Sequence, residues 1–297
     1  IKSRSNAYHH VLADSVRGTD EILNPNLSAA ALDGVADDSG GVSVFGSNGF
    51  TAAGNDVAWV AESSSTYVAW CWKESATAGF DIVTFTGSGG TQNISHSLSA
   101  KPELILNKSR SAIGNWYVYH GANTSAPETD FLQLQATDAT ADNATLWNDT
   151  APTTSVFTVG SAFDNTTTYV AYVFASKQGF SKFGSYTGNG NADGTFVYLG
   201  FRPAFVIVKR TDSSTNGNWV MHDNKRANSF NEIDARLFPN TNDAESSNGN
   251  GKIDFLSNGF KYRTSSDGQN GSGNEMIYMA FAEAPFVNSN GVPCNAR

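Results

Sequence analysis

An internal repeat of about 100 residues constrains this chain more than any other feature of its sequence. The sequence "FTG" at 85–87, with "KP" at 101–102 and then Lys108, returns 101 residues later as "YTG" at 186–188, "RP" at 202–203 and Lys209. The run "TYVAWCWKE" at 66–74 returns as "TYVAYVFAS" at 168–176 and as "IYMAFAE" at 277–283. Solenoid repeats are shorter, roughly 20–45 residues. The repeat therefore predicts three tandem domains: residues 1–78, which lack the opening hairpin of the unit; residues 79–178; and residues 179–297, which carry a C-terminal tail.

Within each unit the hydrophobic pattern has a period of two, which is typical of β-strands. The stretch "GFDIVTFTGSGGTQNISHSL" at 79–98 alternates on both sides of a glycine-rich turn, which predicts a hairpin. The runs "PELILNK" and "PAFVIVK" predict the next strand, because proline fits a strand start. "YVAWCWKE" is apolar on both faces, which predicts a central strand covered on both sides. We expect an all-β fold of tandem antiparallel β-sandwich or jelly-roll-like domains.

The composition excludes several classes of protein. A net charge of −9 with scattered basic residues argues against a nucleic-acid partner. No apolar run reaches about 18 residues, so no membrane insertion is expected. The two cysteines, Cys71 and Cys294, make neither a disulfide scaffold nor a metal cluster, so cores or oligomerisation must stabilise the chain. The chain opens in a strand-like segment without an initiator methionine, and we expect it to be part of a longer protein.

A tryptophan recurs in the same context. Trp116 and Trp219 each follow Gly-Asn, eight to ten residues beyond Lys108 or Lys209, and the first unit places Tyr8 there. A tryptophan buries roughly 150–250 Å² and dominates a small core. We therefore favour a buried structural role in equivalent places over a ligand platform.

The histidines do not form a metal motif. His9, His10, His96, His120 and His222 lie at differing offsets in the units, whereas metal sites need ligands at fixed spacing. We interpret them as structural or surface residues.

Other candidate sites are equally weak. "DSVR" at 14–17 and "DNKR" at 223–226 share an Asp–Arg spacing of three, which favours a turn closed by a local ion pair over a ligand-binding pair. Residues 189–194 resemble the start of a calcium loop, but position one is Asn and Gly200 stands where the bidentate Glu should fall, which favours a hairpin turn. The acidic stretches 138–143 and 242–252 could hold calcium weakly, but solvated loops are favoured.

No enzyme template fits the sequence. It contains no nucleophile elbow and no phosphate loop. A glycosidase needs two carboxylates about 5–10 Å apart, and no acidic pair recurs at fixed spacing. The prediction is a non-enzymatic protein with no catalytic residues, no metal ligands, no cofactor and undefined binding residues.

Four stretches carry a resemblance to a known family: residues 179–212, "NWVMHDNKR" at 218–226, "DFLSNGFK" at 254–261 and the ending "IYMAFAEAPFVNSNGVPCNAR" at 277–297. They resemble a repeated domain of uncharacterised function in tail-fibre or appendage proteins of marine tailed phages, such as cyanophages and pelagiphages. The resemblance covers essentially the whole chain and implies no catalytic residue.

The resemblance implies a structural protein on the surface of a bacteriophage virion. The expected role is host attachment by the distal part of a tail fibre. Expected partners are copies of the same chain, most simply in a trimer, other virion proteins, and a host-surface glycan or protein. Two alternatives stay open: a capsid-decorating or head-fibre protein, and a tailspike polysaccharide depolymerase.

Overall fold

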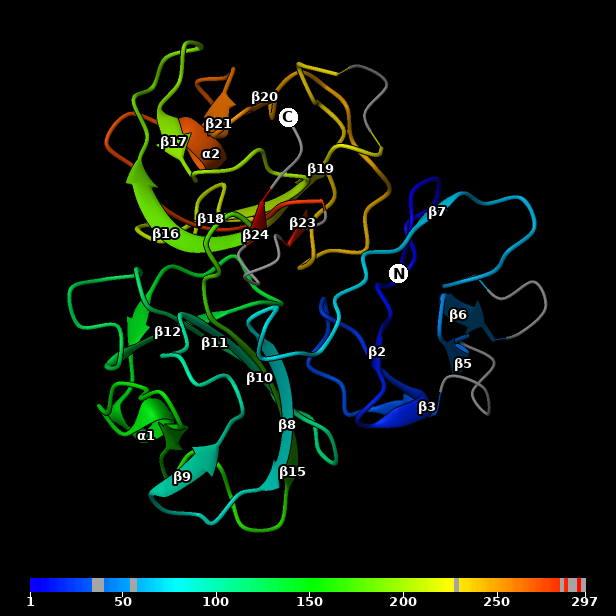
Figure 1. The fold of residues 1–297 in the computed structure, drawn as a ribbon, viewed down its shortest axis with the longest axis vertical. Helices are drawn as coiled ribbons and strands as arrows, with labels where there is room; N and C mark the ends of the chain where they lie inside the picture. Colours follow the sequence, from blue (N-terminus) through cyan, green and yellow to red (C-terminus); the bar gives the residue numbers. More distant parts are fainter. Residues whose placement is uncertain (34–39, 54–57, 227–229, 284–285, 288–292, 295–297) are drawn as a thin grey trace.

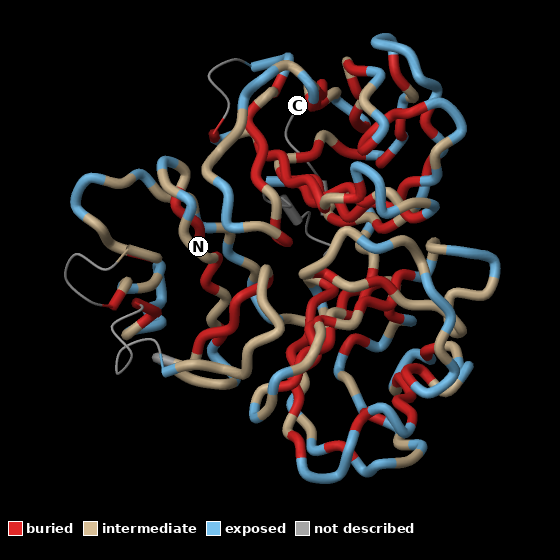
Figure 2. The backbone as a smooth tube through the Cα atoms, turned by 180° about the vertical axis from the view of Figure 1, so that it is seen from behind, coloured by how far each residue is buried: buried red, intermediate tan, exposed pale blue. Residues whose placement is uncertain are grey.

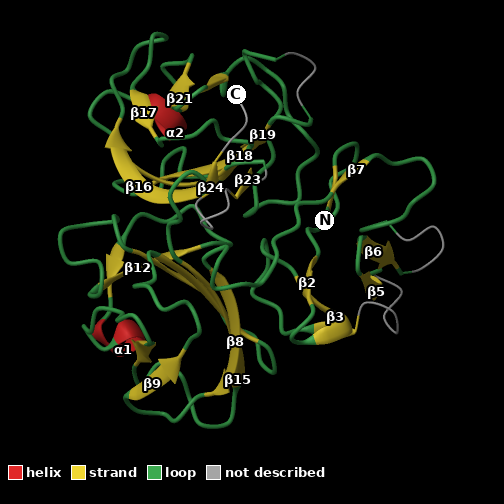
Figure 3. Ribbon diagram, viewed as in Figure 1, coloured by secondary structure: helices red, strands yellow, loops and turns green. Residues whose placement is uncertain are grey.

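In the described residues, antiparallel β-sheets make up most of the regular structure, with two helices of four residues each, α1 and α2 (Figure 3). The computed structural model describes residues 1–33, 40–53, 58–226, 230–283, 286–287 and 293–294. Within these ranges no helix is long and apolar enough to span a membrane. Three lobes lie around a common centre (Figure 1). We use the predicted ranges 1–78, 79–178 and 179–297 to name the first, second and third segments.

The first segment is the smallest lobe and has short strands. It contains β1 (Lys2–Ser3), β2 (Leu12–Asp14), β3 (Gly18–Leu23), β4 (Leu32–Asp33), β5 (Val42–Gly46), β6 (Gly49–Ala52) and β7 (Tyr67–Val68). The pairs are β1 with β7, β2 with β3, β3 with β4, and β5 with β6.

The second segment is built on a six-stranded sheet. It contains β8 (Phe80–Thr86), β9 (Gln92–Ser95), β10 (Leu104–Ser109), β11 (Trp116–His120), β12 (Asp130–Gln133), β13 (Ala141–Asp142), α1 (Ala144–Trp147), β14 (Val156–Val159) and β15 (Thr168–Phe174). The strand order is β13-β12-β11-β10-β15-β8, and β14 pairs with β9 in a second sheet.

The third segment has the same core order of strands. It contains β16 (Ser181–Thr187), β17 (Phe196–Tyr198), β18 (Phe205–Arg210), β19 (Val220–Asp223), β20 (Ile253–Leu256), β21 (Gly259–Tyr262), α2 (Asp267–Asn270), β22 (Glu275–Phe281), β23 (Phe286–Val287) and β24 (Pro293–Cys294). The order β16-β22-β18-β19 corresponds to β8-β15-β10-β11, and β17-β21-β20 is the second sheet.

A hydrophobic cluster at the centre draws side chains from all three segments. Trp72 of the first segment packs against Phe205 and Phe281 of the third, with ring centroids 5.3 and 5.7 Å apart. Phe281 in turn packs on Phe174 of the second segment at 6.0 Å. Each segment also has a cluster of its own, and the first segment's is the smallest. Buried backbone accordingly concentrates inside the second and third lobes (Figure 2).

Two predicted features of the strands are wrong in part. β8 and β9 do not form a hairpin, because β8 pairs with β15 while β9 pairs with β14 in the other sheet. The predicted central strand is central in β15 and β22. In the first segment, however, only Tyr67 and Val68 form a strand, and Ala69 and Cys71 are exposed. An apolar pattern shows which faces of a strand could be buried, but the strands that pair with it decide whether they are buried.

Candidate functional site

The segments interlock at three boundaries, each marked by one backbone hydrogen bond in a corresponding place. We call these boundaries seams. The bonds are 2.8 Å long and run from Ala31 N to Arg110 O, from Thr140 N to Thr211 O, and from Glu245 N to Arg4 O. The first joins the first and second segments, the second joins the second and third, and the last returns from the third to the first. The contacts therefore close a ring.

At each of two seams, a tryptophan indole bonds across the boundary. Trp116 Nε1 donates to the Asn24 carbonyl at the first–second seam, and Trp219 Nε1 donates to the Gln133 carbonyl at the second–third seam, both at 3.0 Å. Both side chains are buried, as predicted. A buried indole N–H needs an acceptor, and here the acceptor belongs to the preceding segment.

At the third–first seam the corresponding ring belongs to His10, not to Tyr8 as predicted. His10 Nε2 lies 2.9 Å from the Phe238 carbonyl oxygen and donates to it in the tautomer that carries the Nε2 proton. Tyr8 is half-buried and donates to Glu62 at 3.0 Å. The prediction aligned Tyr8 with the tryptophans because all three are aromatic. Strand register, however, aligns His10 with them.

A buried lysine occupies the same strand position in every segment. Lys2, Lys108 and Lys209 have no exposed surface. Each ammonium donates to two carbonyls: Lys2 to Ser3 and Asn6, Lys108 to Ser28 and Ser109, and Lys209 to Thr137 and Arg210. Burial lowers the pKa of all three to about 8. The recurring spacing of two of these lysines was visible in the sequence, but their burial was not.

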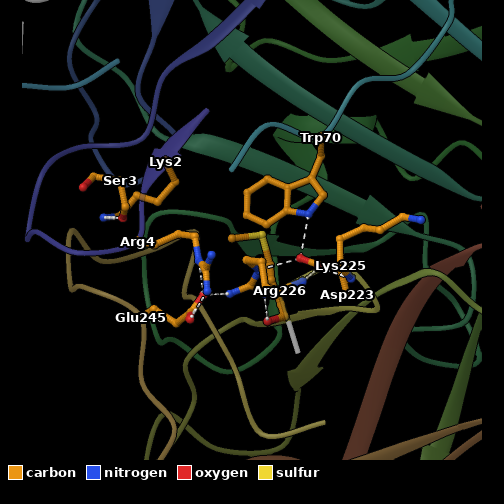
Figure 4. Close-up of polar contacts among 9 residues, drawn as sticks. Lys2, Ser3, Arg4, Trp70, Asp223, Lys225, Arg226 and Glu245 are labelled. Carbon is orange, nitrogen blue, oxygen red and sulfur yellow. Dashed lines mark hydrogen bonds and ion pairs between the residues drawn. The ribbon is translucent and has the colours of Figure 1, made fainter. Parts of the chain in front are cut away.

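A chain of charged and aromatic side chains crosses the third–first seam (Figure 4). Trp70 Nε1 donates to Asp223 Oδ2 at 3.0 Å, and Arg226 Nε donates to the same oxygen at 2.5 Å. Arg226 and Arg4 both reach the Glu245 carboxylate at 2.8 Å. Burial alone would raise the pKa of Asp223, but the Arg226 charge and hydrogen bonds hold it below its usual value. The third segment thus binds the first through the buried carboxylate of Asp223 and the partly buried carboxylate of Glu245.

The first–second seam carries a similar chain. The Tyr172 hydroxyl donates to Asp14 Oδ2 at 2.7 Å, and Arg17 Nε donates to that oxygen at 2.5 Å. Arg110 Nη2 donates to both oxygens of Glu21, at 2.8 and 2.7 Å. Burial opposes the ionised form of Asp14, but Arg17 lowers its pKa below the usual value.

Both Asp–Arg pairs close a local turn, as predicted. Asp14 Oδ1 accepts from the backbone N–H of Arg17, and Asp223 Oδ1 accepts from that of Arg226, both at 2.9 Å. Their extension across a seam was not predicted, because the partners lie far away in the sequence.

The second–third seam is different because neutral groups occupy the corresponding places. His120 stands in the aspartate position, and its Nε2 lies 3.1 Å from the Tyr278 carbonyl oxygen. Thr211 stands where the other seams have Arg4 and Arg110. Within the described ranges, this seam has no counterpart of the two charged chains.

Three of the histidines are buried, and His9 and His96 are partly buried. Burial lowers the pKa of His10 to about 3, of His120 to about 4 and of His222 to about 3. The pKa values of His9 and His96 are also lowered by burial. No group of three or more His, Cys, Asp or Glu side chains in the described part of the chain could hold a metal ion.

In two of the polar loops considered as calcium sites, a carboxylate pairs with basic side chains. In 189–194, Asp193 contacts Lys261 at 2.6 Å and Arg263 at 2.8 Å. This loop joins β16 to β17, which lie in different sheets, so it is not the predicted hairpin turn. The stretch 242–252 contributes Glu245 to a seam, and 138–143 contributes Thr140. Cys71 is a free, exposed thiol, while the side chain of Cys294 lies outside the described part.

One polar pocket of about 400 Å³ lies at the first–second seam. Its lining residues are Thr19, Glu21, Ala31, Leu32, Asp33, Arg110, Ser111 and Thr168. Hydroxyls, two carboxylates and a guanidinium converge there, and Arg110 is already paired with Glu21. The pocket offers hydrogen bonds for a polar ligand.

The family model of a domain of unknown function, DUF7483, matches residues 1–285. The chain belongs to this family. No curated protein and no solved structure matches the chain. The DUF7483 match covers the first and second segments, the third segment up to residue 285, and the three seams that join them.

Proposed function

We propose that the three segments are copies of one β-sandwich-like unit, joined into a closed scaffold. The corresponding strand orders β8-β15-β10-β11 and β16-β22-β18-β19 support this, as do the seam contacts that return at corresponding strand positions. In this proposal the first copy is the incomplete one.

On this scaffold we propose a non-enzymatic structural role: the distal part of a phage tail fibre or appendage, on the virion surface, that attaches to the host. The observation that carries the proposal is that the charged and aromatic side chains join the segments to one another. Buried aspartates, lysines and tryptophans, together with Arg4 and Arg110, bind one segment to the next, while the Asp193 loop is exposed. Loops on a rigid scaffold are where binding usually lies.

The polar pocket is the part of the surface that we propose contacts a host glycan. Hydroxyl and carboxylate side chains hydrogen-bond to sugar hydroxyls, and several weak contacts on one particle add up through multivalency. Thr19 lies at the exposed rim of the pocket, so Thr19→Trp fills the pocket without touching a seam bond.

The test is binding of labelled protein to host cells by flow cytometry. Thr19→Trp should lose most of the binding, and Ser64→Trp, at an exposed loop residue of the same segment, should keep it. Equal binding by both variants would reject the pocket as the contact. No binding by the unaltered chain would reject the adhesion role.

Two alternative roles follow from the same scaffold. A capsid-decorating or head-fibre protein would be labelled by antibody on the head rather than on the tail of the particle. A tailspike depolymerase would release reducing ends from host polysaccharide, which the proposed role does not.

We propose a homo-oligomer, most simply a trimer, together with other virion proteins as partners. Each segment has a modest core and no disulfide in the described residues, and sheet edges need covering. Light scattering of the full-length parent protein gives its mass directly. A stable monomer would contradict the trimer.

A further inference from the structure

The first segment has two sheet edges without a partner strand among the described residues. β15 lies between β10 and β8, and β22 lies between β18 and β16, but β7 pairs with β1 alone. β21 likewise lies between β17 and β20, whereas β6 pairs with β5 alone. The missing neighbour of β7 corresponds to β8 or β16, and the missing neighbour of β6 corresponds to β9 or β17.

Some side chains on or beside these two edges are exposed where their counterparts in the other segments are buried. Strand pairing places Ser3 opposite Tyr67 as it places Ser109 opposite Tyr169, so Cys71 corresponds to Val173. Cys71 is exposed and Val173 is fully buried. Phe45, opposite Phe50 in β5–β6, is 39% exposed, while Phe255, opposite Phe260 in β20–β21, is 1% exposed.

The other two segments show what covers these edges. In each, two consecutive strands joined by a glycine-rich turn pair with two different sheets: β8 with β15 and β9 with β14, then β16 with β22 and β17 with β21. We call this element a β-arch. It covers both edges at once and buries the apolar faces between them.

We propose that the first segment is a docking site for a β-arch supplied from outside residues 1–297, with the sequence pattern shared by 79–98 and 179–198. Its first strand would pair with the outer edge of 67–73, and its second strand with the outer edge of β6. The proposal is independent of the role of the protein in a virion.

The side chains of the acceptor fit this occupant. Phe85 in β8 stacks on Tyr169, with ring centroids 5.3 Å and ring planes 19° apart. In the first segment, Tyr67 corresponds to Tyr169, and its ring would stack with an aromatic side chain of the docked strand. Main-chain hydrogen bonds give such strand addition its affinity, and alternate side chains give it specificity.

The exposed Cys71 thiol reports on docking. The probe is a synthetic peptide of residues 79–98, added to the full chain carrying Cys294→Ser, so that thiol labelling follows Cys71 alone. Saturating peptide should slow labelling of Cys71 at least about tenfold, because the thiol becomes covered. A peptide of the same composition in scrambled order is the control.

Acceptor variants show that the peptide binds at this place. Ala69→Arg puts a charge on the face that docking buries and should abolish the protection of Cys71, while Ser64→Arg at an exposed loop should leave it unchanged. Circular dichroism confirms that both variants fold.

Failure of 79–98 and of 179–198 to protect Cys71 at millimolar concentration would overturn the proposal. Protection that appears without peptide, together with dimerisation of the chain in light scattering, would also overturn it, because a second copy would then be the occupant.

Discussion

A single ring nitrogen at each seam bonds to a backbone carbonyl of the preceding segment. Trp116, Trp219 and His10 share this place, and a buried lysine stands near each of them. A buried carbonyl that loses its donor costs about 1–3 kcal/mol, so these bonds are specific as well as stabilising.

The indole of Trp219 tests the seam bond. Trp219→Ala should lower the free energy of unfolding by about 3–5 kcal/mol, because it empties a buried site. Trp219→Phe keeps most of the volume but leaves the Gln133 carbonyl without its donor, and should cost about 1–3 kcal/mol. Urea denaturation measures both changes. Trp59→Phe, at a half-buried tryptophan outside the seams, should cost under about 1 kcal/mol. Equal costs of the two Phe variants would argue against a stabilising seam bond.

The buried histidines predict sensitivity to acid. Burial lowers the pKa of His10, His120 and His222 to about 3 or 4, while the unfolded chain has histidine pKa values near 6.5. Below that pH the unfolded chain binds more protons. The contribution of these histidines to the free energy of unfolding should therefore be constant above pH 6.5. It should fall toward pH 4 by up to about 1.4 kcal/mol per pH unit for each histidine.

Urea denaturation between pH 7.5 and 4.5 checks the slope. His222→Phe removes one of the three groups and should reduce the slope by about a third. A stability that does not change over this range would contradict the burial of these rings as neutral groups.

At the scale of elements, the two charged chains turn local Asp–Arg turns into links between segments. Asp223 and Arg226 have side chains 4% and 2% exposed, so each ion depends on the other to offset its desolvation. Lys225 and Glu283, in the same region, form a pair with side chains 69% and 57% exposed. The contrast between a buried and an exposed pair gives a matched experiment.

Double-mutant cycles compare the two pairs. Asp223→Ala and Arg226→Ala should each lower the free energy of unfolding by about 3–5 kcal/mol, because each leaves a buried charge alone. The double variant should cost clearly less than their sum. The cycle on Lys225 and Glu283 should give a coupling of at most about 1 kcal/mol. Additive costs at the buried pair would contradict the dependence of each buried ion on the other.

The sequence predicted the elements whose determinants are local. The strands after Pro102 and Pro203, and the Asp14–Arg17 and Asp223–Arg226 turns, follow from neighbouring residues, and the structure confirms them. The pairing of β8 and β9 with different sheets could not be predicted, because alternation within a strand does not name the partner strand. The charged chains across the seams stayed hidden for the same reason: their members lie in different segments.

At the scale of the whole molecule, the three segments share a central cluster and a closed set of seams. Contacts such as Glu245 to Arg4 tie the third segment back to the first. The charged, aromatic and lysine side chains of the seams are engaged in this closure. A rigid scaffold of this kind suits a protein that presents loops to a surface.

The central claim is that the segments interlock into one unit through their seams. Calorimetric unfolding of residues 1–297 tests it most directly, through the ratio of the calorimetric to the van't Hoff enthalpy. Interlocked segments should unfold in one transition with a ratio near 1. Three independent domains would give separate transitions, or a ratio near about 3. That second result would contradict the account.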